Sequence, residues 1–180
     1  HIGAILATKS LTLAAVVDAS VSARQNAVQH WKFESDVRIL PHVDDVRSGV
    51  DVAVVCTPPD QRIDTVQSLV DSGVKLIVVE KPLALSLTEA KNIVSLCEAA
   101  GVCLRVNFHR RFDQAYQRVR IMLEGKTPRR IVMEYGNGLL NYASHHVDLL
   151  LDWFGPVRAV QALGCARGGP DPNLSFCCTL

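Results

Sequence analysis

The chain has 180 residues, of which 48% are hydrophobic and 21% charged, and its formal net charge is +1. This composition is typical of a globular protein, and the length allows one large domain or one domain and part of another. The balanced charge gives no electrostatic reason to expect a nucleic acid as a partner. No apolar run approaches the roughly 18 residues of a membrane span, so we expect no membrane partner.

Strand and helix patterns alternate in the first half of the chain. Five apolar runs are typical of buried strands: residues 11–17, 37–40, 51–57, 76–79 and 102–106. Three segments have helical spacing of apolar residues: 21–31, 63–72 and 88–100. Ser20 is a predicted N-cap, Gly73 and Gly101 are predicted helix ends, and 44–48 is a predicted helical turn. This alternation predicts an α/β fold with a parallel sheet and helices on both faces.

Ligands of such sheets bind outside the carboxyl ends of the strands. Polar residues or prolines stand at four of these ends: Asp18, then Cys56, Thr57 and Pro58, then Glu80, Lys81 and Pro82, and finally Asn107. The turn at 56–58 could hold a dinucleotide, or it could be a rigid loop that the prolines set. The strand ends are therefore the predicted ligand site of the first half.

Asp18 follows the predicted second strand of the sheet. An acidic residue there can accept hydrogen bonds from both ribose hydroxyls of an adenosine, and it would repel a 2′-phosphate. This favours NAD over NADP, although the loop could still admit a phosphate beside Arg24. The local pattern alone favours an ordinary aspartate that caps the next helix.

Lys81 stands at the end of the strand 76–79, between Glu80 and Pro82. A lysine there is partly removed from water, which suits it to proton transfer. The bond to Pro82 is a candidate cis peptide. An exposed ion pair with a neighbouring carboxylate is an equally good interpretation of the tripeptide alone.

The pattern changes after residue 108. Helices are predicted at 112–123 and 144–154, with Ser144 as the N-cap of the second and Gly155 after its end. An exposed type of strand is predicted at 130–135, followed by strands at 157–163 and 174–180 on either side of a loop at 168–170.

His145 and Asp148 are three residues apart, so they share a face of the predicted helix, just after Asn141. The helix N-terminus disfavours an imidazolium, so a neutral His145 could accept a proton, or it could only bond its neighbours. We expect no metal, because adjacent histidines on a helix diverge and no third ligand cluster is present. Arg111 lies at the seam between the halves, where it could contact a ligand or link the domains.

These pieces together resemble the Gfo/Idh/MocA family, named for glucose–fructose oxidoreductase and inositol dehydrogenase. The matching segments are 16–18 (VVD), 57–59 (TPP), 80–83 (EKPL), 107–112 (NFHRRF) and 144–148 (SHHVD). The resemblance implies a Rossmann-type, doubly wound domain over residues 1–108. It also implies part of an α+β domain with a mostly antiparallel sheet over 109–180.

The resemblance further implies hydride transfer between NAD(H) or NADP(H) and a hydroxyl-bearing carbon of a sugar, cyclitol or nucleotide sugar. Lys81 and His145 would be catalytic, and Lys81, Arg111, Asn141 and His145 would bind the substrate. The implied cofactor-binding residues are Asp18, Ala19, Arg24, Cys56, Thr57, Pro58, Glu80, Lys81, Pro82 and Asn107.

Three departures from the family pattern matter. The glycine-rich pyrophosphate loop and its strand are absent, and the chain ends before the second sheet is complete, so we expect a truncated chain. Asn141 stands where the family often has an aspartate, so proton transfer would rest on Lys81 and His145. Alternatives are a non-catalytic nucleotide- or sugar-binding subunit, an inert remnant, and redox-assisted lyase or glycoside cleavage.

The remaining expectations concern the setting of the protein. The six cysteines include no C-x-x-C pair, so we expect reduced thiols and a cytoplasmic protein. Unpaired edges of the second sheet predict a homo-oligomer that forms through that sheet.

Overall fold

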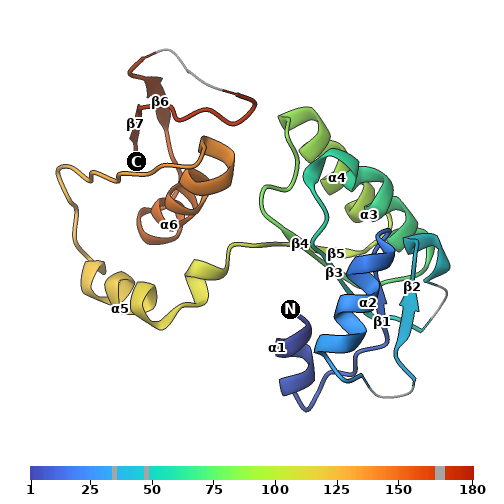
Figure 1. Cartoon of the computed structure of the whole chain (residues 1–180). Helices are drawn as coiled ribbons and strands as arrows, with labels where there is room; N and C mark the ends of the chain where they lie inside the picture. Colours follow the sequence, from blue (N-terminus) through green and yellow to red (C-terminus); the bar gives the residue numbers. More distant parts are fainter. Residues whose placement is uncertain (34–35, 47–48, 165–168) are drawn as a thin grey trace. The chain divides into compact units, whose positions relative to one another are not determined.

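The computed structural model describes residues 1–33, 36–46, 49–164 and 169–180. The chain divides into two compact units, His1–Arg105 and Val106–Leu180 (Figure 1). The predicted loop at 168–170 and the predicted turn at 44–48 each lie partly outside the described residues. No helix in the described ranges is long and apolar enough to cross a membrane.

The first unit alternates helices and strands. Its elements are α1 (Ile2–Ala7), β1 (Ala15–Val17), α2 (Val21–His30), β2 (Arg38–Leu40), β3 (Val52–Val55), α3 (Arg62–Asp71), β4 (Leu76–Glu80), α4 (Leu87–Ala99) and the start of β5 (Cys103–Asn107), which continues into the second unit. Short 3₁₀ turns, Val43–Asp45 and Pro59–Gln61, precede β3 and α3. Ser20 caps α2 as predicted, because its hydroxyl accepts a hydrogen bond from the Ala23 amide.

The strands of this unit form two parallel ladders. β1 pairs with β2 from Ala15↔Arg38 to Val17↔Leu40, and β3 pairs with β4 from Val52↔Leu76 to Val55↔Val79. The order β3-β4-β5 completes the second ladder, and no hydrogen bonds between the described strands join the two ladders. The predicted strand 11–17 is too long: only its last three residues pair, because β2 itself has three residues.

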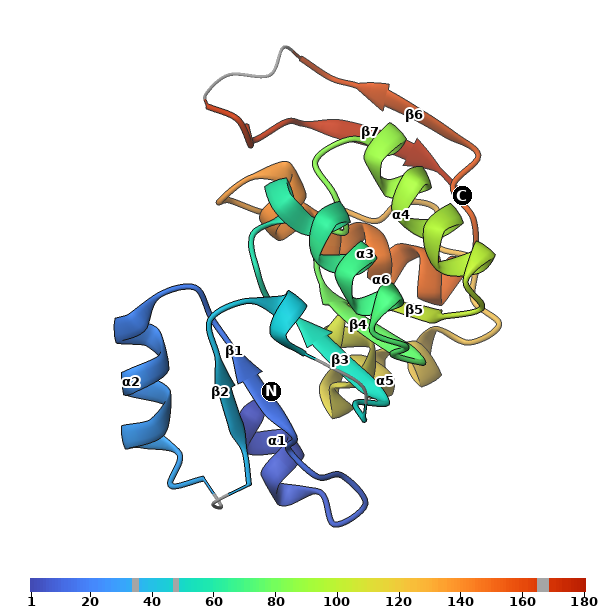
Figure 2. The same cartoon turned by 90° about the vertical axis from the view of Figure 1, so that its right-hand side faces the viewer.

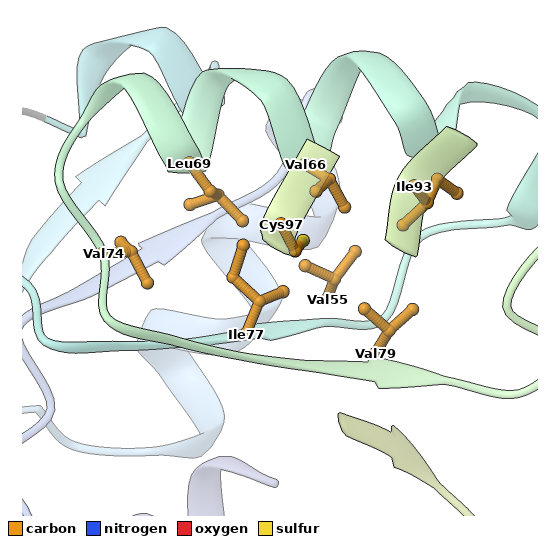
Figure 3. Packing of buried hydrophobic residues seen from close by; sticks show 8 residues of the cluster. All are labelled: Val55, Val66, Leu69, Val74, Ile77, Val79, Ile93 and Cys97. Atoms are coloured by element: carbon orange, nitrogen blue, oxygen red, sulfur yellow. The ribbon is translucent and has the colours of Figure 1, made fainter. Parts of the chain in front are cut away.

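The core of the first unit lies between β3 and β4 on one side and α3 and α4 on the other (Figure 3). Its buried residues are Val55, Val66, Leu69, Val74, Ile77, Val79, Ile93 and Cys97. Burying each large apolar side chain contributes about 1.5–3 kcal/mol. This packing holds the carboxyl ends of β3 and β4 beside each other, because the two strands are paired in register up to Val55 and Val79.

The second unit begins with a 3₁₀ turn, His109–Phe112, and continues with α5 (Gln114–Leu123) and α6 (Ser144–Phe154). A π-helical turn, Leu139–Ala143, runs directly into α6. β6 (Ala159–Ala162) and β7 (Phe176–Thr179) form an antiparallel pair, and their arrows run in opposite directions in Figure 2.

Two predictions for the second unit are wrong. Residues 130–135 form no strand, because this segment makes no ladder with β6, β7 or another described strand. Ser144 is not an N-cap, because the preceding turn is already helical and places Ser144 inside the first turn of α6. Its hydroxyl is buried and makes no hydrogen bond.

Candidate functional site

The loop after β1 is held by its own side chains. The Asp18 carboxylate accepts a hydrogen bond of 2.8 Å from the Ser20 amide, so it supports the start of α2 as the capping interpretation describes. Arg24 donates from Nη1 to the carbonyl oxygens of Asp18 and Ala19, at 2.6 and 3.1 Å. A bound ribose would share the Asp18 carboxylate with the Ser20 amide. A 2′-phosphate could bind Arg24 only if Arg24 gave up its bonds to the carbonyl oxygens of Asp18 and Ala19.

The loops that follow β3 and β4 are joined by one buried side chain, Arg62. This residue is 1% exposed and begins α3. Its Nη2 donates to the carbonyl oxygen of Thr57, while its Nη1 donates to those of Glu80, at 2.7 Å, and Pro82. Burial lowers the pKa of Arg62 from its usual value. The two predicted cofactor segments, 56–58 and 80–82, are thereby tied together within the first unit.

Lys81 lies between the two carbonyl groups that Arg62 binds, at the end of β4, and its peptide bond to Pro82 is cis. The neighbouring Glu80 accepts a hydrogen bond of 2.7 Å from Nε2 of His1, so the start of α1 also lies at this strand end. Partial removal from water and the Glu80 carboxylate raise the pKa of the Cys56 thiol. Cys56 is therefore a poor nucleophile at neutral pH.

In the second unit, His145 occupies the first turn of α6 and is 5% exposed. Its ring meets those of His109 and Phe108 edge to face, with centroids 5.0 and 6.0 Å apart. Asp148 is 6% exposed, so both residues lie on the buried side of α6, as their spacing predicts. Asn107 ends β5, just before this cluster in the sequence.

Arg111 is held by two carboxylates of α6. Its Nε and Nη2 bind Oδ2 and Oδ1 of Asp148 at 2.7 and 2.6 Å, and its Nη1 lies 3.4 Å from Oδ1 of Asp152. The bond to Asp148 is the main cause of a raised pKa of Arg111. These bonds lie within the second unit, so a link between the domains and a substrate contact of Arg111 both stay predictions.

The turn that carries Asn141 is capped from far along the chain. Oδ1 of Asp171 accepts from the Leu140 amide at 2.7 Å, and Oδ2 accepts from the Asn141 amide at 2.9 Å. Gly138 starts this turn with a φ of +96°, and a Cβ atom there would lie 2.0 Å from Asp171 Oδ2. Asp171 therefore shapes the segment that leads into His145.

Beside this turn, the guanidinium of Arg110 lies 4.8 Å from the Tyr142 ring centroid, and the ring of His146 meets Tyr142 edge to face at 5.7 Å. Burial, and then the positive charge of Arg110, lower the pKa of His146. His146 therefore favours its neutral form, and it lies in the first turn of α6, near the cation of Arg110.

Sequence reasoning missed Arg62 and Asp171. The signal for Arg62 was present: positions 62, 66 and 69 share one helix face, and Val66 and Leu69 make that face apolar. No local pattern indicates Asp171, because its partners stand about 30 residues earlier.

The described residues contain no group of three His, Cys, Asp or Glu side chains that could hold a metal ion. Cys56, Cys97, Cys103, Cys177 and Cys178 are free thiols.

Comparisons with known proteins identify the family of the chain. Residues 1–108 match the GFO_IDH_MocA family model, described as an oxidoreductase family with an NAD-binding Rossmann fold. The scyllo-inositol 2-dehydrogenase (NAD(+)) of Bacillus subtilis (strain 168) is 35% identical over 94 residues, which are 52% of this chain and 25% of that protein. The inositol 2-dehydrogenase of Rhizobium meliloti (strain 1021) is 28% identical over 120 residues, 67% of this chain and 35% of that protein.

A similar solved structure is the WlbA dehydrogenase from Bordetella pertussis in complex with NADH and UDP-GlcNAcA. Its TM-score is 0.75 at 27% identity, and the match covers 90% of this chain and 56% of that one. The matches to the two curated relatives cover about a quarter and a third of their lengths.

Proposed function

The chain belongs to the Gfo/Idh/MocA family of oxidoreductases with an NAD-binding Rossmann fold. We therefore propose that it takes part in hydride transfer between NAD(H) and a hydroxyl-bearing carbon. The proposed substrate is a sugar, cyclitol or nucleotide sugar. The observation that carries the proposal is the end of β4, where Lys81 stands between two carbonyl groups tied to the loop after β3.

The first unit would bind the cofactor at its strand ends. Asp18 would accept hydrogen bonds from the adenosine ribose, and the segments 56–58 and 80–82 would line the rest of the dinucleotide. Arg24 already donates to two main-chain carbonyls, which supports NAD over NADP. A titration of NADH fluorescence, repeated with NADPH, tests this preference.

The chemistry needs a hydride acceptor, which NAD⁺ supplies when it is bound, and a group that takes the hydroxyl proton. Lys81 would contact the reacting hydroxyl, and His145, in the first turn of α6, would accept the proton. Asn141 can orient a hydroxyl but cannot take its proton. Proton transfer would therefore rest on Lys81 and His145.

Replacing Lys81 tests the catalytic proposal. Lys81→Met should lower turnover by roughly 100-fold or more, because a proton-transfer group is lost, while the Kd for NADH changes little. The measurement is NADH formation from NAD⁺ with myo-inositol, scyllo-inositol and uridine-diphosphate sugars. Lys75→Met is the matched control, since Lys75 is exposed and pairs only with Asp51 on the surface.

Turnover of Lys81→Met equal to that of the unchanged protein would refute the catalytic role. NADH binding without turnover of any compound in the panel would instead favour a non-catalytic nucleotide- or sugar-binding subunit. The asparagine at position 141, which cannot accept a proton, is the observation that favours this second candidate.

A further inference from the structure

We propose that Arg62 is a positioning residue that fixes Lys81 by binding the carbonyl groups on both sides of it. The structural part of the inference stands on the contacts of Arg62 alone, and its consequence for NADH rests on the proposed function. Arg62 itself needs no contact with cofactor or substrate.

The contacts of Arg62 go beyond the needs of helix packing. α3 is already anchored by Val66 and Leu69, which are 0% and 4% exposed in the core. Arg62 lies on the same face, one turn earlier, and its guanidinium binds the main chain of two loops rather than a side chain. None of the ion pairs between described residues includes it.

The carbonyl groups that Arg62 binds belong to strand ends. β3 ends at Val55 and β4 at Glu80, so the carbonyl oxygens of Thr57 and Pro82 lie beyond the paired ladder, where no neighbouring strand supplies a donor. The guanidinium supplies hydrogen-bond donors to the main-chain oxygens of both loops at once. The clamp therefore sets the spacing between the segments 56–58 and 80–82.

Only an arginine has the geometry for this task. Its planar fork presents separate nitrogens, and here Nη1 binds the Glu80 and Pro82 carbonyls while Nη2 binds that of Thr57. A lysine at position 62 would present one nitrogen, which cannot occupy the separate positions of Nη1 and Nη2 and would hold the two loops less well. The buried cation is stabilised by main-chain dipoles, so removing the guanidinium frees both loops while the core residues stay in place.

The experiment compares Arg62→Met and Arg62→Lys with Val66→Ala in the whole chain. Val66→Ala removes core packing from the same helix without touching either loop, so it controls for lost stability. The first readout is the rate at which an amine-reactive acetylating reagent labels Lys81, followed by mass spectrometry, with the exposed Lys91 as an internal reference. The second readout is the Kd for NADH from fluorescence.

In Arg62→Met we expect Lys81 to be labelled at least about threefold faster relative to Lys91, because an unclamped loop opens more often. The NADH Kd should rise roughly 3- to 10-fold, since misplaced binding groups lose affinity steeply. Arg62→Lys should lie between Arg62→Met and the unchanged chain, and Val66→Ala should leave the labelling ratio unchanged while its melting temperature falls.

Unchanged labelling and an unchanged Kd in both Arg62 variants would overturn the inference. The same holds if Val66→Ala accelerates labelling as much as Arg62→Met, because the effect would then follow stability alone. Should Arg62→Met not fold, Arg62→Lys carries the test. Faster labelling in the variants together with no NADH binding by the unchanged chain would support the clamp and contradict the proposed binding of NADH by this chain.

Discussion

The two units of the chain are stabilised in different ways. The first has an apolar core of eight buried side chains between two helices and a parallel ladder. Arg62 is a charged residue that is also buried in this unit. In the second, the described buried side chains are those of Ala143, Leu149 and Leu150 together with His145 and Asp148, and long-range polar bonds join its segments. This difference indicates that burial of apolar area stabilises the first unit, whereas individual polar bonds determine the structure of the second unit, which carries His145.

The largest effect should come from the core of the first unit. Ile77→Ala removes a 0% exposed side chain from β4 and should lower the free energy of unfolding of this unit by about 3–4 kcal/mol. Each unit contains one tryptophan, Trp31 in the first and Trp153 in the second. Urea titrations followed by Trp31 fluorescence in a Trp153→Phe background therefore report the first unit. A loss below about 1 kcal/mol would contradict a core-based first unit.

A smaller effect is expected from the ion pair of the second unit. Asp148→Ala leaves the half-buried Arg111 without its closest carboxylate and should cost about 2 kcal/mol, below the range for a fully buried pair because Arg111 is partly exposed. Trp153 fluorescence in a Trp31→Phe background measures this loss. Asp152→Ala is the control, because its bond to Arg111 is longer, at 3.4 Å, and its loss should be smaller. Equal losses of unfolding free energy in Asp148→Ala and Asp152→Ala would show that the shorter bond to Asp148 stabilises the unit no more than the longer bond to Asp152.

The smallest effect concerns pH. Because the folded chain holds the pKa of His146 below its ordinary value of 6.5, the unfolded chain takes up a proton at a higher pH than the folded chain. The second unit should therefore lose stability as the pH falls below about 6.5 and keep it above that value. His146→Gln should flatten this dependence by less than about 1 kcal/mol between pH 7.5 and 5.5. Melting curves at several pH values measure this change of stability. If His146→Gln shows the same pH dependence as the unchanged chain, other groups cause that dependence.

The part of the fold that could be predicted from the sequence is the part that local burial determines. The cores of β3, β4, α3 and α4 follow from apolar spacing, because each element shows one face to a common core. The strand predicted at 130–135 failed because strand formation needs a partner, and pairing between distant segments leaves no local signal. The prediction that Ser144 is an N-cap was wrong for a similar reason, because the turn before it is held by Asp171, which stands far along the sequence.

The candidate site divides in the same way. The strand-end residues Thr57 and Lys81 could be located because parallel strands place their carboxyl ends at one edge of a sheet, and Asp18 follows β1 in the other ladder in the same way. Their catalytic and binding roles stay predictions. The residues that hold the site, Arg62 and Asp171, act through main-chain atoms of other segments, so the residue type alone does not reveal the partner.

The cap that Asp171 places on Leu140 and Asn141 has a consequence for the order of events during protein synthesis. A ribosome makes α6 and β6 before it makes the carboxylate that completes the turn in front of α6. Until residue 171 has left the exit tunnel, two amides at the entrance to α6 have only water as a partner, and Asn141 and His145 lack their final setting. The segment that precedes His145 in the chain can therefore mature only after residue 171 has been made.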